Sequence, residues 1–433
     1  MQRKIVNELE RWRTSSGHKP LLLHGARQVG KTYSVLEFGR IHYANTLYVS
    51  LEDSTEIAGV FQRNLDPDRI VRELAALTGQ VVDPVNTLIV FDEIQAVPRA
   101  LTSLKYFAEG PTPYQVIATG SLLGIALKEK DEDYSFPMGK VDMATMYPMD
   151  FEEFCWATGQ DHLLDLIRDA FGSGTSNPAH QRTLDAFRQH LAIGGMPEVV
   201  GTFVSQSDLN LVAAAQKSLN DGAIADMAKY ATPRDTARII GAWSSLPAQL
   251  AKENRRFQYS LIRSGARASQ YEWAIHWLLS AGLVLNTSLT TQGRVPLAAH
   301  ADLDSFKLYM YDTGLLTSKL EIPLHQMINA PQILSGFAGP MTENYIAQTF
   351  AATGITSYFW ASPGKAEVDF VYQSSSGDVV PVEVKAGDHV RSKSLARFIE
   401  LYHPRQAVRV STKDFGTENG IRSVPLYAAW LLD

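Results

Sequence analysis

His24-Gly25-Ala26-Arg27-Gln28-Val29-Gly30-Lys31-Thr32 is the stretch that decides the fold of the first part of the chain. It fits the pattern G-x-x-x-x-G-K-[ST] without a mismatch and directly follows an apolar run, residues 20–23. Its two glycines allow a tight turn in which successive backbone N–H groups converge on one anion at the start of the next helix. The pattern therefore predicts a phosphate-binding loop between a strand and a helix.

Each residue of this loop receives an expected role. Lys31 is expected to reach the terminal phosphates of ATP, and the Thr32 hydroxyl to ligate Mg²⁺. A glycine-rich turn with an unrelated lysine is the alternative, but the amphipathic stretch 32–40 after the loop favours the nucleotide site. The predicted nucleotide-binding residues here are Gly25, Ala26, Arg27, Gln28, Val29, Gly30, Lys31 and Thr32.

A second nucleotide signal is the apolar run 88–91, which ends in Asp92-Glu93 as a Walker B strand does. We expect Asp92 to hold the Mg²⁺ shell and Glu93 to polarise the attacking water, because hydrolysis needs a base close to the nucleophile. Strands ending in two acids are common, so the signal gains its weight from the preceding phosphate loop.

Further polar residues could complete this site. Thr119 and Ser121 follow the next apolar run and could sense the γ-phosphate, although a simple strand-end turn explains them equally well. Arg27, Arg99 and Lys105 could supply positive charge to the transition state, and the sequence does not choose between them.

The fold class expected from this pattern is α/β. Short apolar runs at residues 21–23, 46–51, 87–91 and 115–118 alternate with amphipathic segments, which is typical of a parallel P-loop NTPase sheet. We place this AAA-type ATPase domain at residues 1–150.

Three further regions are expected after it. Residues 151–234 have helical spacing and read as a helical lid, interrupted at 172–178 and 194–197. Residues 235–318 predict three short helices and a hairpin of 283–285 with 306–311, the outline of a winged helix. Packing and DNA binding are equally good explanations of that module. Residues 319–433 form the last region.

The last region carries a constellation of acids. Glu343 lies on an expected helix, Asp369 on a strand, and Glu383 and Lys385 on the next strand, where alternation puts them on one face. The two strands join through a turn at 374–378, so Asp369, Glu383 and Lys385 should lie within reach of one point. We expect Glu343, Asp369 and Glu383 to hold Mg²⁺, while Lys385 stabilises charge or assists deprotonation.

An exposed hairpin whose acids and lysine pair across strands is the alternative. Basic residues around the motif outnumber Asp388 and Glu400 and could form a phosphate-facing surface, although a solvated helix face explains them almost as well. These basic residues are Lys385, His389, Arg391, Lys393, Arg397, Arg405 and Arg409.

Composition limits the class of protein. The chain has 433 residues, 45% hydrophobic and 20% charged, with a net charge of −6, so no global basic field attracts nucleic acid. Cys155 is the only cysteine, which excludes an intrachain disulfide and favours a reducing cytoplasm. No stretch approaches the ~20 apolar residues of a membrane span, so no membrane partner is expected.

Together these motifs resemble, over nearly the whole chain, a family of prokaryotic AAA-type ATPases with a C-terminal domain of unknown function similar to the PD-(D/E)xK nuclease fold. The resemblance implies an ATPase core, a helical region, a winged helix and a restriction-endonuclease-like end. One departure is Lys140, where relatives usually show arginine, so a bidentate contact at this position is in doubt. The stretches that carry the resemblance are residues 25–32, 91–95, 119–123, 148–154, 194–197, 308–316 and 381–387.

Three functions remain open at this stage. The first is Mg²⁺-dependent ATP hydrolysis that moves the winged-helix and nuclease-like domains, acting on DNA. The second is a Mg²⁺-dependent nuclease that ATP only licenses. The third is a nucleotide-gated module that binds a protein partner without DNA chemistry. AAA-type relatives often supply an arginine in trans, so a homo-oligomer is a further possible partner.

Overall fold

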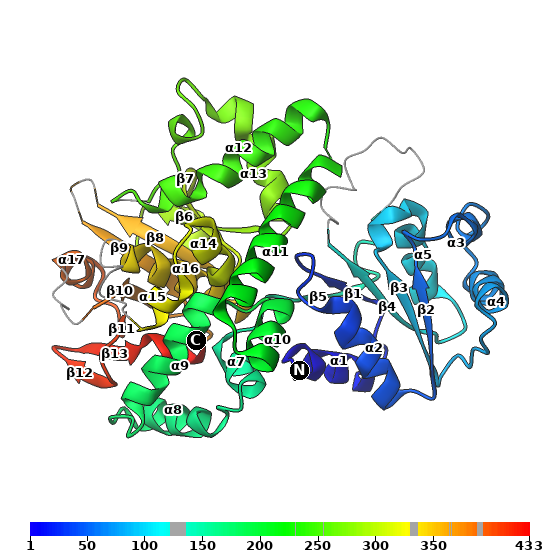
Figure 1. Ribbon diagram of the computed structural model, residues 1–433, viewed down its shortest axis with the longest axis horizontal. Helices are drawn as coiled ribbons and strands as arrows, with labels where there is room; N and C mark the ends of the chain where they lie inside the picture. Colours follow the sequence, from blue (N-terminus) through cyan, green and yellow to red (C-terminus); the bar gives the residue numbers. More distant parts are fainter. Residues whose placement is uncertain are drawn as a thin grey trace. The chain divides into compact units, whose positions relative to one another are not determined.

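A computed structural model describes residues 1–121, 136–229, 231–253, 255–329, 337–362, 364, 366–387 and 393–433. Asp388, His389 and Arg391, named above, lie outside these ranges, as do residues 122 and 123 of the stretch 119–123 and residue 230 of the helical region. The chain divides into two compact units (Figure 1). The N-terminal unit comprises Arg3–Tyr147 with Ser280–Gly282, and the C-terminal unit comprises Met1–Gln2, Pro148–Leu279 and Leu283–Asp433.

The N-terminal unit is an α/β structure built on a parallel sheet, which confirms the predicted fold class for this part. The strand order is β2-β3-β4-β1-β5, and every neighbouring pair is parallel. The strands are β1 (Leu21–His24), β2 (Asn45–Ser50), β3 (Thr87–Asp92), β4 (Gln115–Gly120) and β5 (Asp142–Thr145). The first four match the apolar runs, whereas β5 was missed because its sequence, Asp-Met-Ala-Thr, is short and half polar.

Helices cover this sheet on both faces, which explains why β3 is buried along its whole length. One face, with Val49, Phe91 and Ala118, forms a core with side chains of α3, α4 and α5. Helix α2 contacts β2, β3 and β4. The helices are α1 (Ile5–Thr14), α2 (Lys31–His42), α3 (Thr55–Val60), α4 (Pro67–Thr78), α5 (Pro98–Glu109) and the 3-10 turn η1 (Ile94–Ala96).

The C-terminal unit begins with the helices predicted for residues 151–234. A reciprocal capping box between Asp150 and Glu153 starts the first of them, and Pro197 occupies the first turn of another. These helices are α7 (Phe151–Ala157), α8 (His162–Ser173), α9 (His180–Ile193), α10 (Pro197–Gln206) and α11 (Leu209–Lys229).

The next segment differs from the prediction of three short helices. It contains one long helix, α12 (Pro233–Leu250), a single 3-10 turn, η2 (Tyr259–Leu261), and helix α13 (Ala268–Ser280). Pro247 lies inside α12 and does not end it. The predicted hairpin is present as β6 (Val284–Thr290) paired with β7 (Ala301–Met310), connected through η3 (Leu297–His300).

An eight-stranded mixed sheet, with the order β12-β13-β11-β10-β9-β8-β6-β7, organises the unit. The predicted wing hairpin is part of it, because β6 pairs in parallel with β8. The strands are β8 (Ser357–Ala361), β9 (Glu367–Gln373), β10 (Val379–Val384), β11 (Ala407–Ser411), β12 (Gly416–Glu418) and β13 (Ile421–Pro425). Residues on both sides of the predicted boundary at 318 thus share one sheet, and the domain division itself stays a prediction.

Helices also pack on this sheet. Phe350 of α16 contacts Phe370 and Tyr372 of β9, and Phe398 of α17 contacts Trp360 of β8. These contacts place α16 over the strands that carry the predicted acids. The remaining helices are α14 (Thr313–Lys319), α15 (Leu324–Asn329), α16 (Ala338–Ala352), α17 (Lys393–Tyr402) and the 3-10 helix η5 (Leu426–Leu431).

Candidate functional sites

The loop between β1 and α2 has the conformation that its glycines allow. Gly25 and Gly30 have φ values of 150° and 96°, and a Cβ atom on Gly25 would overlap the carbonyl oxygen of Met146. The Lys31 ammonium group folds back onto the loop and donates to the carbonyl oxygens of Gly25 at 2.9 Å and Ala26 at 2.8 Å. The lysine is therefore held inside the turn that the motif predicts for phosphate.

Asp92, at the carboxyl end of β3, is the centre of a polar network beside this loop. Its carboxylate accepts hydrogen bonds from the Thr32 hydroxyl at 2.9 Å, from the Tyr48 hydroxyl at 2.9 Å and from the Thr119 hydroxyl. Only 6% of Asp92 is exposed. The structure thus brings together Thr32 and Asp92, the two residues predicted to ligate Mg²⁺, and both offer the oxygen ligands that this ion prefers.

Glu93 begins a separate cluster on the same sheet edge. It has a left-handed backbone conformation with φ 52°. Its carboxylate accepts a hydrogen bond from the Gln95 amide, another from the Ser121 hydroxyl at 3.4 Å, and lies 3.9 Å from the Arg27 guanidinium. The predicted base is therefore oriented by polar groups on three different segments.

Burial changes the proton affinity of two groups in this region. Burial lowers the pKa of Lys31 to about 8, although the carboxylates of Glu93 and Asp92 act in the opposite direction. Burial, followed by the charge of Lys31, also lowers the pKa of His24. An anion bound beside Lys31 would raise this pKa again, so the neutral fraction of Lys31 would take up a proton on binding.

The other basic candidates have partners elsewhere. Arg99 donates to the carbonyl oxygens of Phe61 and Arg63, each at 2.8 Å, so it anchors a loop. Lys105 is exposed on α5, and Lys140 pairs with Glu109 at 2.8 Å. Of the three residues considered for transition-state charge, the structure places only Arg27 next to Glu93.

Three residues of this site were missed by sequence reasoning. Arg3 is buried and donates to the carbonyl oxygens of Val29 at 2.7 Å and Tyr147 at 2.6 Å. These hydrogen bonds connect the glycine-rich loop to the segment at Tyr147. Tyr48 and Gln95 contact the two acids, as described above. Gln95 could have been noticed because it follows the acidic pair within the stretch 91–95, whereas nothing in the sequence marks Arg3 or Tyr48.

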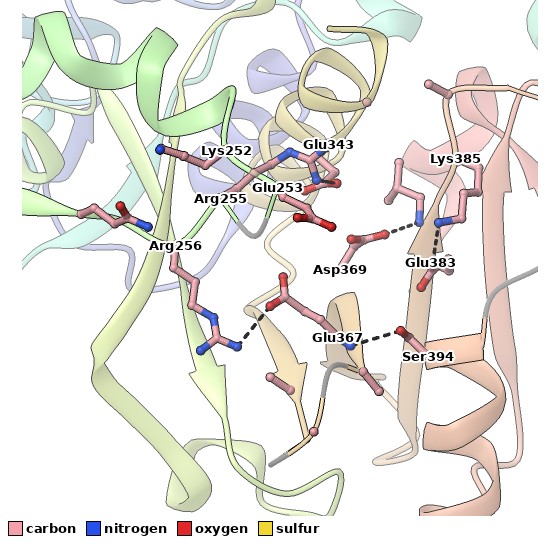
Figure 2. Close-up of a pocket in the computed structure, with 17 residues that line it drawn as sticks. Lys252, Glu253, Arg255, Arg256, Glu343, Glu367, Asp369, Glu383, Lys385 and Ser394 are labelled. Atoms are coloured by element: carbon pink, nitrogen blue, oxygen red, sulfur yellow. Dashed lines mark hydrogen bonds and ion pairs between the residues drawn. The ribbon is translucent and has the colours of Figure 1, made fainter. Parts of the chain in front are cut away.

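A second candidate site is a polar cavity of about 900 Å³ in the C-terminal unit. Glu343 of α16, Asp369 of β9, and Glu383 and Lys385 at the end of β10 all line it, so the residues predicted from the acid constellation do meet in one place (Figure 2). The hairpin of β9 with β10 is antiparallel through the predicted turn. Further lining residues come from outside the region 319–433, among them Lys252, Glu253, Arg255 and Arg256.

The acids of this cavity are engaged by cations and by the backbone. Arg255 forms an ion pair with Glu343, and Arg256 pairs with Glu367 at 3.2 Å (Figure 2). Lys385 pairs with Glu383 at 2.6 Å. The carboxylate of Asp369 accepts the backbone N–H of Val384 at 2.9 Å.

A fully buried lysine, Lys307 of β7, lies close to two of these acids. Its ammonium group is 2.7 Å from Glu367 and 3.9 Å from Glu343. Burial, and then the nearby charge of Asp369, raise the pKa of Glu343. Among the described residues, no group of three or more His, Cys, Asp or Glu side chains is arranged to hold a metal ion. In this conformation cations of the chain itself neutralise the acids.

Three of the basic residues around the motif are paired with acids. Arg397 pairs with Glu400 at 2.7 Å, Arg405 with Asp378 at 3.4 Å, and the buried Arg409 with Glu418 at 3.5 Å. The phosphate-facing surface stays a prediction.

Comparison with known protein families identifies the first part of the chain. Residues 17–155 match the model of an AAA domain. The N-terminal unit is a P-loop NTPase domain of the AAA type. Two domains of unknown function match further along: DUF8612 at residues 184–326 and DUF4143 at residues 338–429. The cavity of the C-terminal unit combines residues of both matched ranges. No curated protein matches the sequence.

The chain is also similar to several solved structures. The Walker-type ATPase PABY2304 of Pyrococcus abyssi is 16% identical, with a TM-score of 0.44, over 74% of this chain and 95% of that chain. The Aeropyrum pernix ORC2 protein in ADPNP-ADP complexes is 15% identical, with a TM-score of 0.35, over 76% and 93%. The Aeropyrum pernix ORC1 protein in complex with DNA is 11% identical, with a TM-score of 0.30, over 74% and 91%.

No helix in the described ranges combines the length and the apolar composition that crossing a membrane requires.

Proposed function

We propose that the N-terminal unit binds ATP and hydrolyses it with Mg²⁺. The observation that supports this most is the position of Asp92, whose carboxylate is held by the hydroxyl groups of Thr32, Tyr48 and Thr119 at the mouth of the glycine-rich loop. A magnesium ion bound by Thr32 and Asp92 would neutralise charge on the phosphates.

The other residues of the loop then act on the nucleotide directly. Backbone N–H groups from Gly25 to Thr32 hold the phosphates, and Lys31 leaves the carbonyl oxygens of its own loop to bind the terminal phosphates. Glu93 accepts a proton from the attacking water, in a position set by Gln95 and Ser121. Arg27, close to Glu93, supplies positive charge.

The experiment is a phosphate-release assay on the full chain. Lys31→Ala should reduce ATP turnover by roughly a hundredfold or more, since it removes a charge that acts in the transition state. Lys19→Ala, which removes an exposed lysine of the same unit, is the matched control and should hydrolyse ATP like the parent. Unchanged turnover in Lys31→Ala would contradict the proposal.

Hydrolysis alone does not explain the C-terminal unit. We infer that the nucleotide state moves this unit on DNA, with α12, η2, α13 and the β6–β7 hairpin as a winged-helix module and the following part as a nuclease-like module. Retention of the full chain on duplex DNA at low salt, lost steeply as salt rises, is the expected result. Failure to bind DNA at low salt would favour a protein partner instead.

A second candidate function, Mg²⁺-dependent DNA cleavage in the C-terminal unit, is favoured by one observation. Glu343, Asp369, Glu383 and Lys385 come from one helix and two strands and line the same cavity. The three acids are not arranged around a metal ion in this conformation, but an ion that drew them together would receive oxygen ligands from them. It would lower the pKa of a bound water, and Lys385 would stabilise charge on the phosphate.

This candidate is tested by incubating linear duplex DNA with the protein, Mg²⁺ and ATP. Asp369→Asn should abolish cleavage, while Asp378→Asn, in the turn of the same hairpin, should retain it. Equal cleavage by parent and Asp369→Asn would indicate a contaminating nuclease.

A further inference from the structure

The ion pairs of the C-terminal cavity join two parts of the chain that lie far apart in the sequence. Arg255 and Arg256 precede η2, and Lys307 is on β7, whereas their partners Glu343 and Glu367 belong to α16 and β9. Cations of the residues before 319 therefore neutralise the acids of the residues after it.

Glu343 depends on these cations. Its side chain is 4% exposed, and the hydroxyl of Tyr309, 3.5 Å from one carboxylate oxygen, is its only neutral partner among the contacts of the described residues. A buried carboxylate that loses its cationic partner is strongly disfavoured, so some cation must be present whenever Glu343 is ionised. Lys307 is fully buried and fixed between Glu343 and Glu367, whereas Arg255 lines the cavity itself.

Arg255 is held in its position at a conformational cost. Its φ is 49°, in the left-handed region that an arginine rarely adopts. The guanidinium side chain is 17% exposed, toward the same cavity that Asp369 and Lys385 line (Figure 2).

The charges of the cavity define what can enter it. Its lining acids are Glu253, Glu343, Glu367, Asp369 and Glu383, and its lining cations are Lys252, Arg255, Arg256 and Lys385. Together with the buried Lys307 these charges balance, and Arg255, Arg256 and Lys385 are each engaged by an acid, so they do not attract a phosphate group. A divalent cation among the acids adds positive charge and makes the arginines available.

We propose that Arg255 exchanges partners: it neutralises Glu343 until a divalent cation binds at Glu343 and Asp369, and it then binds a backbone phosphate of DNA. This inference rests on the second candidate function, because it concerns the same cavity. Arg255 is thus a DNA-binding residue of the cleavage site that lies outside the acid motif, and DNA binding at this site requires the metal ion.

The exchange predicts opposite effects of one substitution. In Arg255→Gln, Mn²⁺ measured by electron paramagnetic resonance should bind roughly tenfold more tightly, because the metal no longer displaces a guanidinium. The same variant should bind a short duplex DNA roughly tenfold more weakly by fluorescence anisotropy in Ca²⁺, which replaces Mg²⁺ to prevent cleavage. A purely structural role of Arg255 would weaken both.

Matched variants complete the experiment. Arg263→Gln removes an exposed arginine of the neighbouring segment and should leave both affinities unchanged. Arg255→Lys keeps the cation and should bind Mn²⁺ like the parent, which keeps the test valid if Arg255→Gln folds poorly. Glu343→Gln frees Arg255 from the other side and should raise DNA binding in the absence of metal.

The substitution Asp369→Asn shows which part of the measured Mn²⁺ binding belongs to this cavity. If Arg255→Gln binds no more Mn²⁺ than Arg255→Gln with Asp369→Asn, the cavity holds no metal and the cleavage proposal fails together with the exchange. If Arg255→Gln and the parent bind Mn²⁺ equally, and both exceed Asp369→Asn, the metal site stands and only the exchange is wrong. Tighter Mn²⁺ binding with weaker DNA binding supports the exchange.

Discussion

The carboxylate of Asp312 accepts the backbone N–H of Gly195 at 2.7 Å, across 117 positions of the sequence. The same carboxylate caps α14 by accepting the N–H of Leu315 at 2.9 Å. The carbonyl oxygen of Gly195 in turn accepts the N–H of Met149 at 2.7 Å. Three of the motifs noted in the sequence, around 148–154, 194–197 and 308–316, therefore meet at one buried point of the C-terminal unit.

This junction predicts a large loss of stability in Asp312→Ala. Buried backbone N–H groups, among them those of Gly195 and Leu315, would lose their acceptor, at a cost of roughly 2–4 kcal/mol in the free energy of unfolding. Urea unfolding followed by tryptophan fluorescence measures it, because all tryptophans except Trp12 lie in the C-terminal unit. Asp208→Ala, which removes an exposed cap of α11, should cost about 1 kcal/mol or less. Equal losses would show that the junction is unimportant.

The same carboxylate predicts a pH dependence. Burial raises the pKa of Asp312 from its ordinary 3.8 to about 6, so between these values the folded state binds a proton that the unfolded state releases. The contribution of this group to stability is therefore present below pH ~4 and lost as the pH rises through ~6. Asp312→Asn cannot ionise. Its free energy of unfolding, relative to the parent, should improve from pH ~4 to pH ~7, and a constant difference would contradict the assignment.

From the lowered pKa of Lys31 we expect the protein to take up protons when it binds ATP. With a pKa of about 8, roughly half of the Lys31 side chains are neutral at that pH, and bound phosphates restore the charge. Calorimetric titration at pH ~8 in two buffers of different ionisation enthalpy should reveal an uptake of up to roughly half a proton. Near pH ~6.5 the uptake should vanish, and in Lys31→Arg it should be absent at both pH values. Identical heats in the two buffers at pH ~8 would sink the idea.

Glu93 is expected to act on the chemical step and not on binding. Glu93→Gln keeps the shape of the side chain but cannot accept a proton, so turnover should fall by roughly 10²–10⁴-fold while the affinity for ATP changes little. Single-turnover hydrolysis and binding of a fluorescent ATP analogue separate the two quantities. Glu109→Gln, an exposed glutamate of α5, is the control. A variant that loses affinity in proportion to turnover would indicate that Glu93 positions the nucleotide instead.

The sequence predicted which residues meet around the glycine-rich loop because the information for this grouping is local. The glycine turn, the apolar strand and the acids at its end are each read from adjacent residues, and parallel strands bring their carboxyl ends to one edge. Tyr48 and Arg3 were not predicted as site residues because their contacts depend on how distant segments pack. Arg3, for example, reaches the loop and Tyr147 across 144 positions.

The C-terminal unit was harder to predict for the same reason. The acids of β9 and β10 follow from alternation along a hairpin, but nothing local indicates that β6 pairs with β8 and thereby brings Lys307 behind Glu367. The motif at 194–197 was noticed without an explanation. In the structure, a Cβ atom on Gly195 would overlap the carbonyl oxygen of Met149. The glycine of this motif therefore allows two backbone segments to pack closely.

Lys307 itself carries the last prediction. Lys307→Met should destabilise the C-terminal unit by roughly 3–5 kcal/mol, because Glu367 and Glu343 would lose a buried cation. In Lys307→Met with Glu367→Gln both partners of the closest pair are neutral, so most of that loss should be recovered. Urea unfolding of the parent, the two single variants and the double variant gives the coupling energy directly. Strict additivity of the two substitutions would show that the lysine fills space on β7, and that the acids of the cavity are neutralised by the arginines alone.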